Sequence, residues 1–178
     1  FMGIAILGIG LFWMQKDHYK AYQQWNKAQM FYNNKAYEAA LEVYEPLYPL
    51  LKHKPEFLFE AAQSLSKTGQ YEKANEYLER AVLLSSDPML YYVMAKNEQC
   101  LGEYRQAEKH LLHAIDILPE RIYPYYLLMN LYTEPSYFQP AKLKKAIDSV
   151  LTKKPKVESS AIKEMKEKAR SMLNNTSI

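Results

Sequence analysis

The chain has 178 residues, of which 48% are hydrophobic and 24% are charged; this fits one domain, or a domain with an appendage, and excludes disorder throughout. Only 5 residues are Gly against 9 Pro, which argues against folds rich in tight β-hairpins and favours helices. The net charge of +3 is too small to indicate nucleic acid, so we expect no nucleic-acid partner, and the single Cys100 excludes an intrachain disulfide.

The first segment, residues 1–14, reads FMGIAILGIGLFWM and carries no charged side chain. A secretory signal peptide would need a basic stretch before this run and a small-residue cleavage site after it, and neither is present. A buried core helix would need its whole circumference covered by a small domain. As a helix the segment spans about 21 Å, short of the roughly 30 Å hydrocarbon core of a bilayer. We therefore predict that residues 1–15 are the end of a transmembrane helix that continues upstream, with Trp13 near the water boundary.

Beyond residue 20 the sequence repeats itself. The segment LSKTGQYEKANEYLERAVLL at 65–84 aligns with NEQCLGEYRQAEKHLLHAIDIL at 97–118. Four landmarks recur with a shift of 33 residues, namely Gly69 and Gly102, Tyr71 and Tyr104, Ala74 and Ala107, and Ala81 and Ala114. Weaker copies lie upstream, at Tyr37 and Ala40, and downstream, at Phe138 and Ala141. A period of 33–34 residues with small residues at helix crossings predicts a helix–turn–helix solenoid.

The pattern G-x-Y-x-x-A, followed seven residues later by a second Ala, resembles the tetratricopeptide repeat. The resemblance implies an all-α, tetratricopeptide-like solenoid over residues 16–153. Its helix–turn–helix repeats, about four in number, lie near 21–54, 55–87, 88–121 and 122–154. The first copy lacks the turn glycine and has Asn34 and Lys35 at that corner.

A final helix follows the repeats. Pro155 predicts the start of a capping helix over residues 155–173, and residues 174–178 are expected to fray. Residues 141–178 hold 10 Lys or Arg against 4 Asp or Glu. This basic excess is interpreted either as a solvated helix face or as a surface for an anionic partner such as lipid head groups.

In the tetratricopeptide register, the fifth and ninth positions of each first helix point into the concave groove. The fifth positions are aromatic, and the ninth positions are polar: Trp25, Phe59, Tyr92 and Tyr126, followed by Gln29, Gln63, Lys96 and Asn130. Such a ladder predicts a groove that binds an extended protein or peptide segment, and stacking on the sugar rings of a glycan is an alternative. Because the same residue types are common at these positions in the family, generic groove chemistry stays open as well.

The sequence contains no recognisable catalytic constellation. His110 and His113 lie three residues apart and could share a metal, but no carboxylate or thiol is spaced along the sequence to complete the site. Cys100 is expected to be packed and not reactive. We predict a non-enzymatic chain with no metal and no cofactor, and a metal-dependent enzyme built on the two histidines is the remote alternative.

A second resemblance concerns the whole chain. The apolar segment ending near Trp13 is followed by AYQQWNKAQMFYNNKAYEAALEVYEPLYPLL at 21–51, and the combination resembles the C-terminal end of Bacteroides-type O-antigen ligase or polymerase-like membrane proteins. The resemblance implies a membrane-tethered interaction scaffold of surface polysaccharide assembly, located at the bacterial inner membrane, with the transferase residues upstream. A free-standing membrane-anchored or exported adaptor is the alternative. Lys16 and Lys20 do not decide on which side of the membrane the repeats lie.

Overall fold

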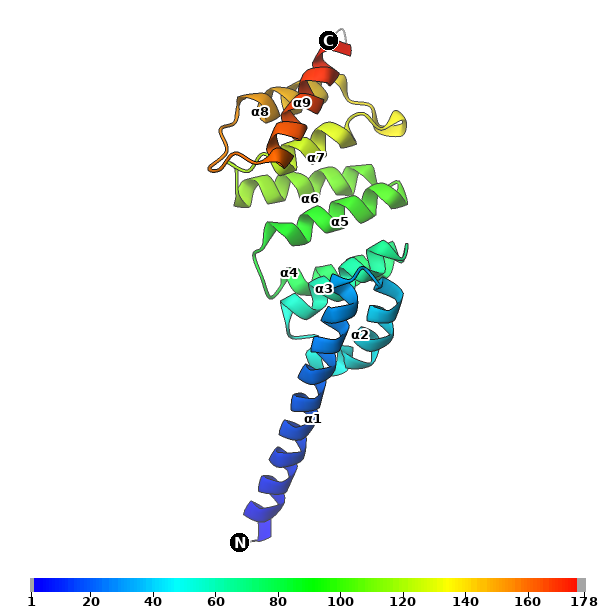
Figure 1. Ribbon diagram of the computed structural model, residues 1–178, viewed down its shortest axis with the longest axis vertical. Coiled ribbons are helices and arrows are strands. Elements are labelled where there is room, and N and C mark those ends of the chain that lie inside the picture. Colours follow the sequence, from blue (N-terminus) through cyan, green and yellow to red (C-terminus); the bar gives the residue numbers. More distant parts are fainter. Residues whose placement is uncertain (1, 176–178) are drawn as a thin grey trace. The chain divides into compact units, whose positions relative to one another are not determined.

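The computed structural model describes the backbone of residues 2–175 and the side chains of residues 18–174. Within those residues every regular element is a helix (Figure 1). The elements are α1 (Met2–Asn33), α2 (Tyr37–Leu51), α3 (Pro55–Lys67), α4 (Tyr71–Val82), α5 (Pro88–Leu101), α6 (Tyr104–Ile117), α7 (Tyr123–Leu131), the 3-10 helix η1 (Pro135–Tyr137), α8 (Pro140–Thr152) and α9 (Ser160–Asn175).

The chain divides into two compact units, residues 1–85 and 86–178, and each is described by itself. The first unit contains α1 to α4, and the second contains α5 to α9. Within each unit, successive helices pack as antiparallel pairs: α1 with α2, α3 with α4, α5 with α6, and α7 with α8. This pairing of helices joined by short turns is the arrangement that the repeat spacing predicts.

Small residues lie where the helices of a pair come together. Ala74 and Ala81 of α4 have no exposed surface, and neither have Ala107 and Ala114 of α6. The two alanines of each helix are seven residues apart, about two turns, so they lie on one face, and their short side chains let the neighbouring helix approach. Larger side chains fill the remaining core, among them Tyr44, Phe57, Leu58 and Leu78 in the first unit and Leu111, Met129, Leu131 and Ile147 in the second.

The turns inside the repeats use left-handed backbone. Gly69 has φ 82° and Gly102 has φ 78°, values that glycine adopts without a steric penalty. Lys35 stands at the corresponding corner of the first repeat with φ 60°, the one positive value for a non-glycine residue among those described. A side chain in this region costs about 1 kcal/mol or more, so the first turn is closed under strain.

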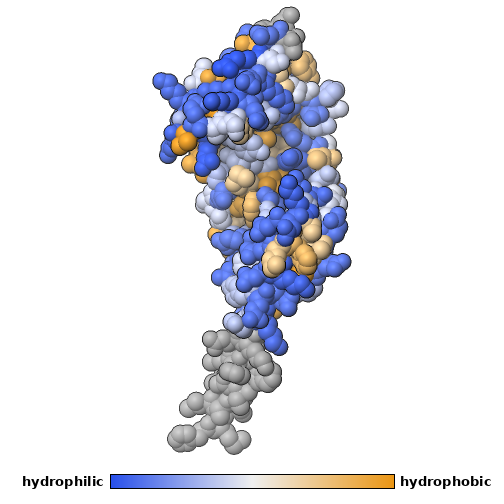
Figure 2. Space-filling model, viewed as in Figure 1, coloured by the Kyte–Doolittle hydropathy of each residue, from blue (hydrophilic) through white to orange (hydrophobic). Residues whose placement is uncertain are grey.

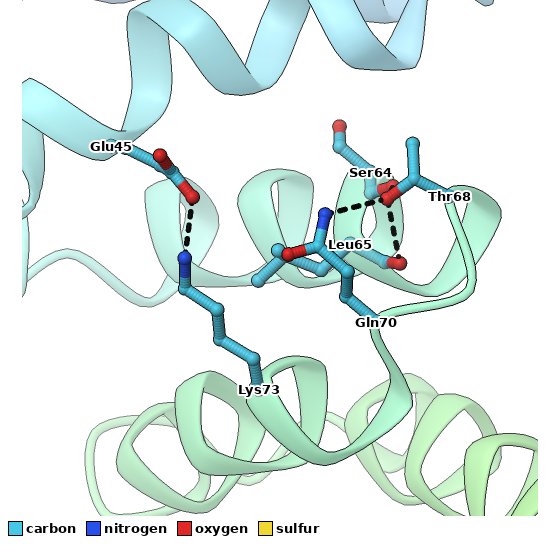
Figure 3. A network of polar contacts seen from close by, with 6 residues as sticks. All are labelled: Glu45, Ser64, Leu65, Thr68, Gln70 and Lys73. Carbon is cyan, nitrogen blue, oxygen red and sulfur yellow. Dashed lines mark hydrogen bonds and ion pairs between the residues drawn. The ribbon is translucent and has the colours of Figure 1, made fainter.

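Polar side chains close the turn between α3 and α4 (Figure 3). The Thr68 hydroxyl lies 3.0 Å from the Leu65 carbonyl oxygen and accepts a hydrogen bond of 3.1 Å from the Gln70 side-chain amide. Nearby, the Lys73 ammonium of α4 forms an ion pair with Glu45 of α2, which links the two helix pairs of the first unit.

The last helix begins later than the sequence predicts. Helix α9 starts at Ser160 and not near Pro155, because the Ser159 hydroxyl accepts a 3.3 Å hydrogen bond from the Ile162 amide and caps the helix. The helix packs on α7 and α8 and buries Ala169 completely. It extends to Asn175, and residues 176–178 of the predicted tail lie outside the described residues. The visible surface around α8 and α9 is mainly hydrophilic (Figure 2).

The predicted membrane segment falls in α1. The α1 backbone is helical from Met2, but the side chains of residues 1–17 lie outside those described. Among the residues that the structure describes, no helix is both long and apolar enough to cross a bilayer. The transmembrane assignment of residues 1–15 stays a prediction.

Candidate functional site

Two of the predicted groove residues in the first unit are tied to one carboxylate. Trp25 Nε1 donates to Glu60 Oε2 over 2.6 Å, and Gln29 Nε2 donates to Glu60 Oε1 over 2.8 Å. The Tyr44 hydroxyl of α2 adds a third bond of 3.1 Å to Oε2. Burial, followed by the nearby Glu60 charge, raises the pKa of Tyr44. Glu60 therefore holds α1, α2 and α3 together.

The other two predicted groove residues of the first unit are half-buried. Gln63 accepts a short hydrogen bond from the Tyr32 hydroxyl of α1, and Phe59 is partly covered. The structure thus gives three of these four side chains a polar partner within the unit. Whether any of them also contacts a ligand stays a prediction.

In the second unit the predicted groove residues have different surroundings. Tyr92 is buried, its ring meets Tyr123 edge to face with centroids 5.2 Å apart, and its hydroxyl has no hydrogen-bond partner among the described residues. Lys96 of α5 is exposed, and Asn130 of α7 is half-buried. Tyr126 is half-buried under the Lys168 ammonium, which lies 5.4 Å from the ring centroid. Lys96 is the most accessible of the four.

Sequence reasoning missed Glu60, although the sequence carries a signal for it. Glu60 is the single charged residue in the apolar run FLFEAA at 57–62, and an acid in such a run must find partners when it is buried. The partners themselves come from α1 and α2, which only the tertiary structure identifies.

The two histidines do not form a site with each other. His110 Nδ1 lies 2.9 Å from the carboxylate of Glu98, whose side chain is 4% exposed, and the His113 ring packs edge to face on Tyr91 with centroids 4.6 Å apart. Sequence spacing showed no carboxylate for His110, and the structure supplies one from the facing helix α5. In the part of the chain that is described, no group of three or more His, Cys, Asp or Glu is placed to hold a metal ion.

The second unit has an open cleft of about 1100 Å³. It lies between the start of α6 and the segment that joins α7 to α8. Its lining comes from two stretches of chain: Gly102, Glu103, Tyr104, Arg105 and Gln106 on one side, and Pro135, Ser136, Tyr137, Phe138, Gln139 and Lys142 on the other. The Tyr104 and Tyr137 rings stack across it with centroids 5.7 Å apart, and Phe138 is 50% exposed.

A second carboxylate, Glu108 of α6, fixes one wall of this cleft. Its oxygens accept hydrogen bonds from the Tyr132 hydroxyl at 2.6 Å, the Tyr137 hydroxyl at 2.7 Å and the Lys142 ammonium at 2.7 Å. Burial raises the pKa of Glu108, but these three donors outweigh burial and bring the pKa below its ordinary value. Burial and the Glu108 charge together raise the pKa of Tyr137 to about 12.

The cleft has the chemistry of a protein-contact surface. Its lining combines tyrosine and phenylalanine rings with two cations and one exposed acid, Glu103. The Arg105 guanidinium forms no ion pair with another residue of the described part of the chain, and Lys142 uses one of its three donors on Glu108. Aromatic rings next to Arg are enriched where proteins bind one another.

Comparison with known proteins agrees with the fold. Residues 33–114 match the family described as anaphase-promoting complex, cyclosome, subunit 3. A putative kinesin light chain from Podosopora anserina with nearly identical TPR-like repeats is 17% identical, with a TM-score of 0.64, and the match covers 88% of each chain. The chain has a tetratricopeptide-type repeat fold. The predicted all-α repeat solenoid is thereby confirmed.

Two further solved structures share this fold. The MamA protein is 17% identical, with a TM-score of 0.68 over 86% of this chain and 88% of that chain. The Yersinia enterocolitica type III secretion chaperone SycD, in complex with a peptide of the translocator YopD, is 19% identical, with a TM-score of 0.55 over 70% of this chain and 90% of that chain. No curated protein matches the sequence. The resemblance to O-antigen ligase-like proteins stays a prediction.

Proposed function

We propose that this chain is a non-catalytic protein-interaction scaffold. The observation that carries the proposal is its tetratricopeptide-type fold, in which paired helices present side chains to partners along their outer faces. The peptide complex of the SycD structure supports a protein or peptide as the partner. A glycan partner is the second candidate, since the predicted ladder of aromatic side chains would also stack on sugar rings.

The scaffold is tethered to a membrane through residues 1–15. Support comes from the uncharged sequence of residues 1–14 and from the unbroken α1 helix, which leads from Met2 into the first helix pair. On the resemblance described above, the chain is the C-terminal module of an O-antigen ligase-like protein at the bacterial inner membrane. The residues encoded before Phe1 test this assignment. Further apolar segments of about 20 residues there support it, and a coding sequence that contains none between its start codon and Phe1 refutes it.

Partner binding is tested by site-specific cross-linking in the cells that make the protein. A photoreactive amino acid replaces Lys96 on α5, Arg105 at the cleft, or Lys109 on α6, all three of which are exposed. We expect the photoreactive residue to give one adduct of defined mass at position 96 or at position 105, and to give none at position 109. Adducts from none of the three, or equally from all, would refute a specific partner surface on the second unit.

The tether is tested by fractionation. Leu7→Asp together with Leu11→Asp places two charges in the apolar segment, and each charge costs about 2.5–3.5 kcal/mol at the centre of a membrane helix. The wild-type chain is expected in the membrane pellet after an alkaline wash, and the double variant in the supernatant. A wild-type chain that is already in the supernatant argues against the tether.

A further inference from the structure

One end of the first unit surrounds the point where α1 leaves the helix pairs. Three segments meet there, and we call their surface the exit face. They are residues 18–22 of α1, residues 50–54 at the end of α2 and in the turn to α3, and residues 80–84 at the end of α4 and just beyond it. The His18 and His53 rings lie 6.4 Å apart, and the Lys54 ammonium lies 6.0 Å from the Tyr22 ring. Arg80 Nε donates to the Lys52 carbonyl oxygen over 2.7 Å. These contacts hold the three segments side by side.

The exit face concentrates exposed apolar side chains. Of the large apolar residues that are exposed in the described part of the first unit, only Met30 lies elsewhere. The others are Tyr19 (65% exposed), Tyr22 (38%), Leu50 (37%), Leu83 (83%) and Leu84 (47%). Two adjacent leucines that are exposed to this extent add nothing to the stability of the unit in water. Covering them with a partner or a membrane would be favourable.

Cations predominate on the exit face, with the exposed acids Glu56 and Glu79 directly beside its segments. Its three segments contain Lys20, Lys52, Lys54 and Arg80, and they contain no Asp or Glu. Lys20, Lys52 and Arg80 are exposed. Cations beside tyrosine and leucine are the composition found where proteins meet the head groups of anionic lipids, since Lys and Arg attract the head groups while tyrosine and leucine enter the interface.

The direction of α1 points to the same occupant. The N-terminal half of α1 extends beyond α2, α3 and α4 from this end of the unit (Figure 1). If residues 1–15 enter a bilayer, the exit face is the surface of the first unit that lies nearest to it.

We propose that the exit face rests on the membrane surface, with Leu83 and Leu84 in the interface and the four cations at anionic head groups. The proposal rests on the proposed tether and extends it, because it makes the first unit a peripheral membrane contact and fixes which end faces the lipid. A partner protein or a second copy of the chain on this face is the competing occupant, and it is an outcome of the test.

The test uses the full chain reconstituted in vesicles of phosphatidylcholine with about one third phosphatidylglycerol. In a Cys100→Ser background, an environment-sensitive dye is attached at Leu83→Cys or at Met30→Cys, the exposed apolar residue outside the exit face. Brominated lipids are expected to quench the dye at position 83 at least threefold more than the dye at position 30. Lys52→Glu combined with Arg80→Glu should reduce the quenching at position 83 by half or more, whereas Lys67→Glu combined with Lys35→Glu, at the opposite end of the unit, should leave it unchanged.

The possible outcomes separate the two proposals. If the chain floats with the vesicles and neither dye is quenched, the tether stands and the exit-face contact is overturned. If the chain does not float, both are overturned. A dye at position 83 that shifts with protein concentration in the absence of lipid, and is not quenched by brominated lipid, shows that a second copy covers the face and also overturns the proposal.

Discussion

The Glu108 cluster provides the sharpest prediction for the second unit. Glu108→Gln keeps the shape of the side chain but turns one acceptor oxygen into an amide donor that faces a tyrosine hydroxyl. The side chain is only 12% exposed, so the loss of one hydrogen bond to a charged acceptor should cost about 2 kcal/mol. The Lys142 side chain is 49% exposed, so its ion pair adds at most about 1 kcal/mol. We expect a total loss of about 2–3 kcal/mol at neutral pH.

The pH dependence of this variant tests the cause. Because the folded-state pKa of Glu108 lies below 4.5, its contribution is complete above about pH 4.5 and is lost as the pH falls through the folded-state value. Cys100 is exposed, not packed as the sequence predicted, so a dye can be attached to it in the second unit. Urea unfolding followed by this dye should show a steeper loss of stability on acidification for the wild type than for Glu108→Gln. The variant Glu103→Gln, which removes an exposed acid, should keep the wild-type slope. Equal slopes for the wild type and Glu108→Gln would refute the reasoning.

Three further changes test other parts of the fold. Lys35→Gly should raise the free energy of unfolding by up to about 1 kcal/mol in urea titrations, because it removes left-handed strain, and a loss of stability would contradict this explanation of the first turn. Glu60→Ala should lower stability by about 2 kcal/mol and shift Trp25 fluorescence, since Trp25 Nε1 loses its acceptor; an unchanged spectrum would count against the cluster. Ala107→Leu should cost about 1–3 kcal/mol by overpacking the buried α6 face, whereas Leu112→Ala, at an exposed position, should have little effect in thermal unfolding.

The repeat architecture was readable in the sequence because it depends on local chemistry. Gly69 and Gly102 mark turns that need left-handed backbone, and the buried Ala74 and Ala107 mark helix crossings. Both signals recur at a fixed period, so the register of a repeat that lacks one of them can be inferred from the neighbouring repeats. The start of α9 was misplaced because Pro155 and Ser159 are both helix-start signals, and only the hydrogen bond to Ile162 decides between them.

The candidate site was less predictable. The eight groove positions were assigned from the repeat register, yet Trp25 and Gln29 donate to Glu60, and Tyr92 is buried. The cleft beside α6 combines residues 102–106 with residues 135–142, and no local pattern links these two stretches.

The sequence by itself determined that this protein is an all-α repeat solenoid, because periodic glycine, alanine and tyrosine specify turns and helix contacts between near neighbours. Only the tertiary structure decided which partners the charged side chains have. Glu98 and Glu108 look like ordinary helix-surface acids and Glu60 stands out only as a charge in an apolar run, but each receives a partner from another helix. The exit face is likewise visible only when three segments far apart in the sequence are brought together. Long-range pairing of this kind depends on which helix faces meet, and a short sequence motif does not encode it.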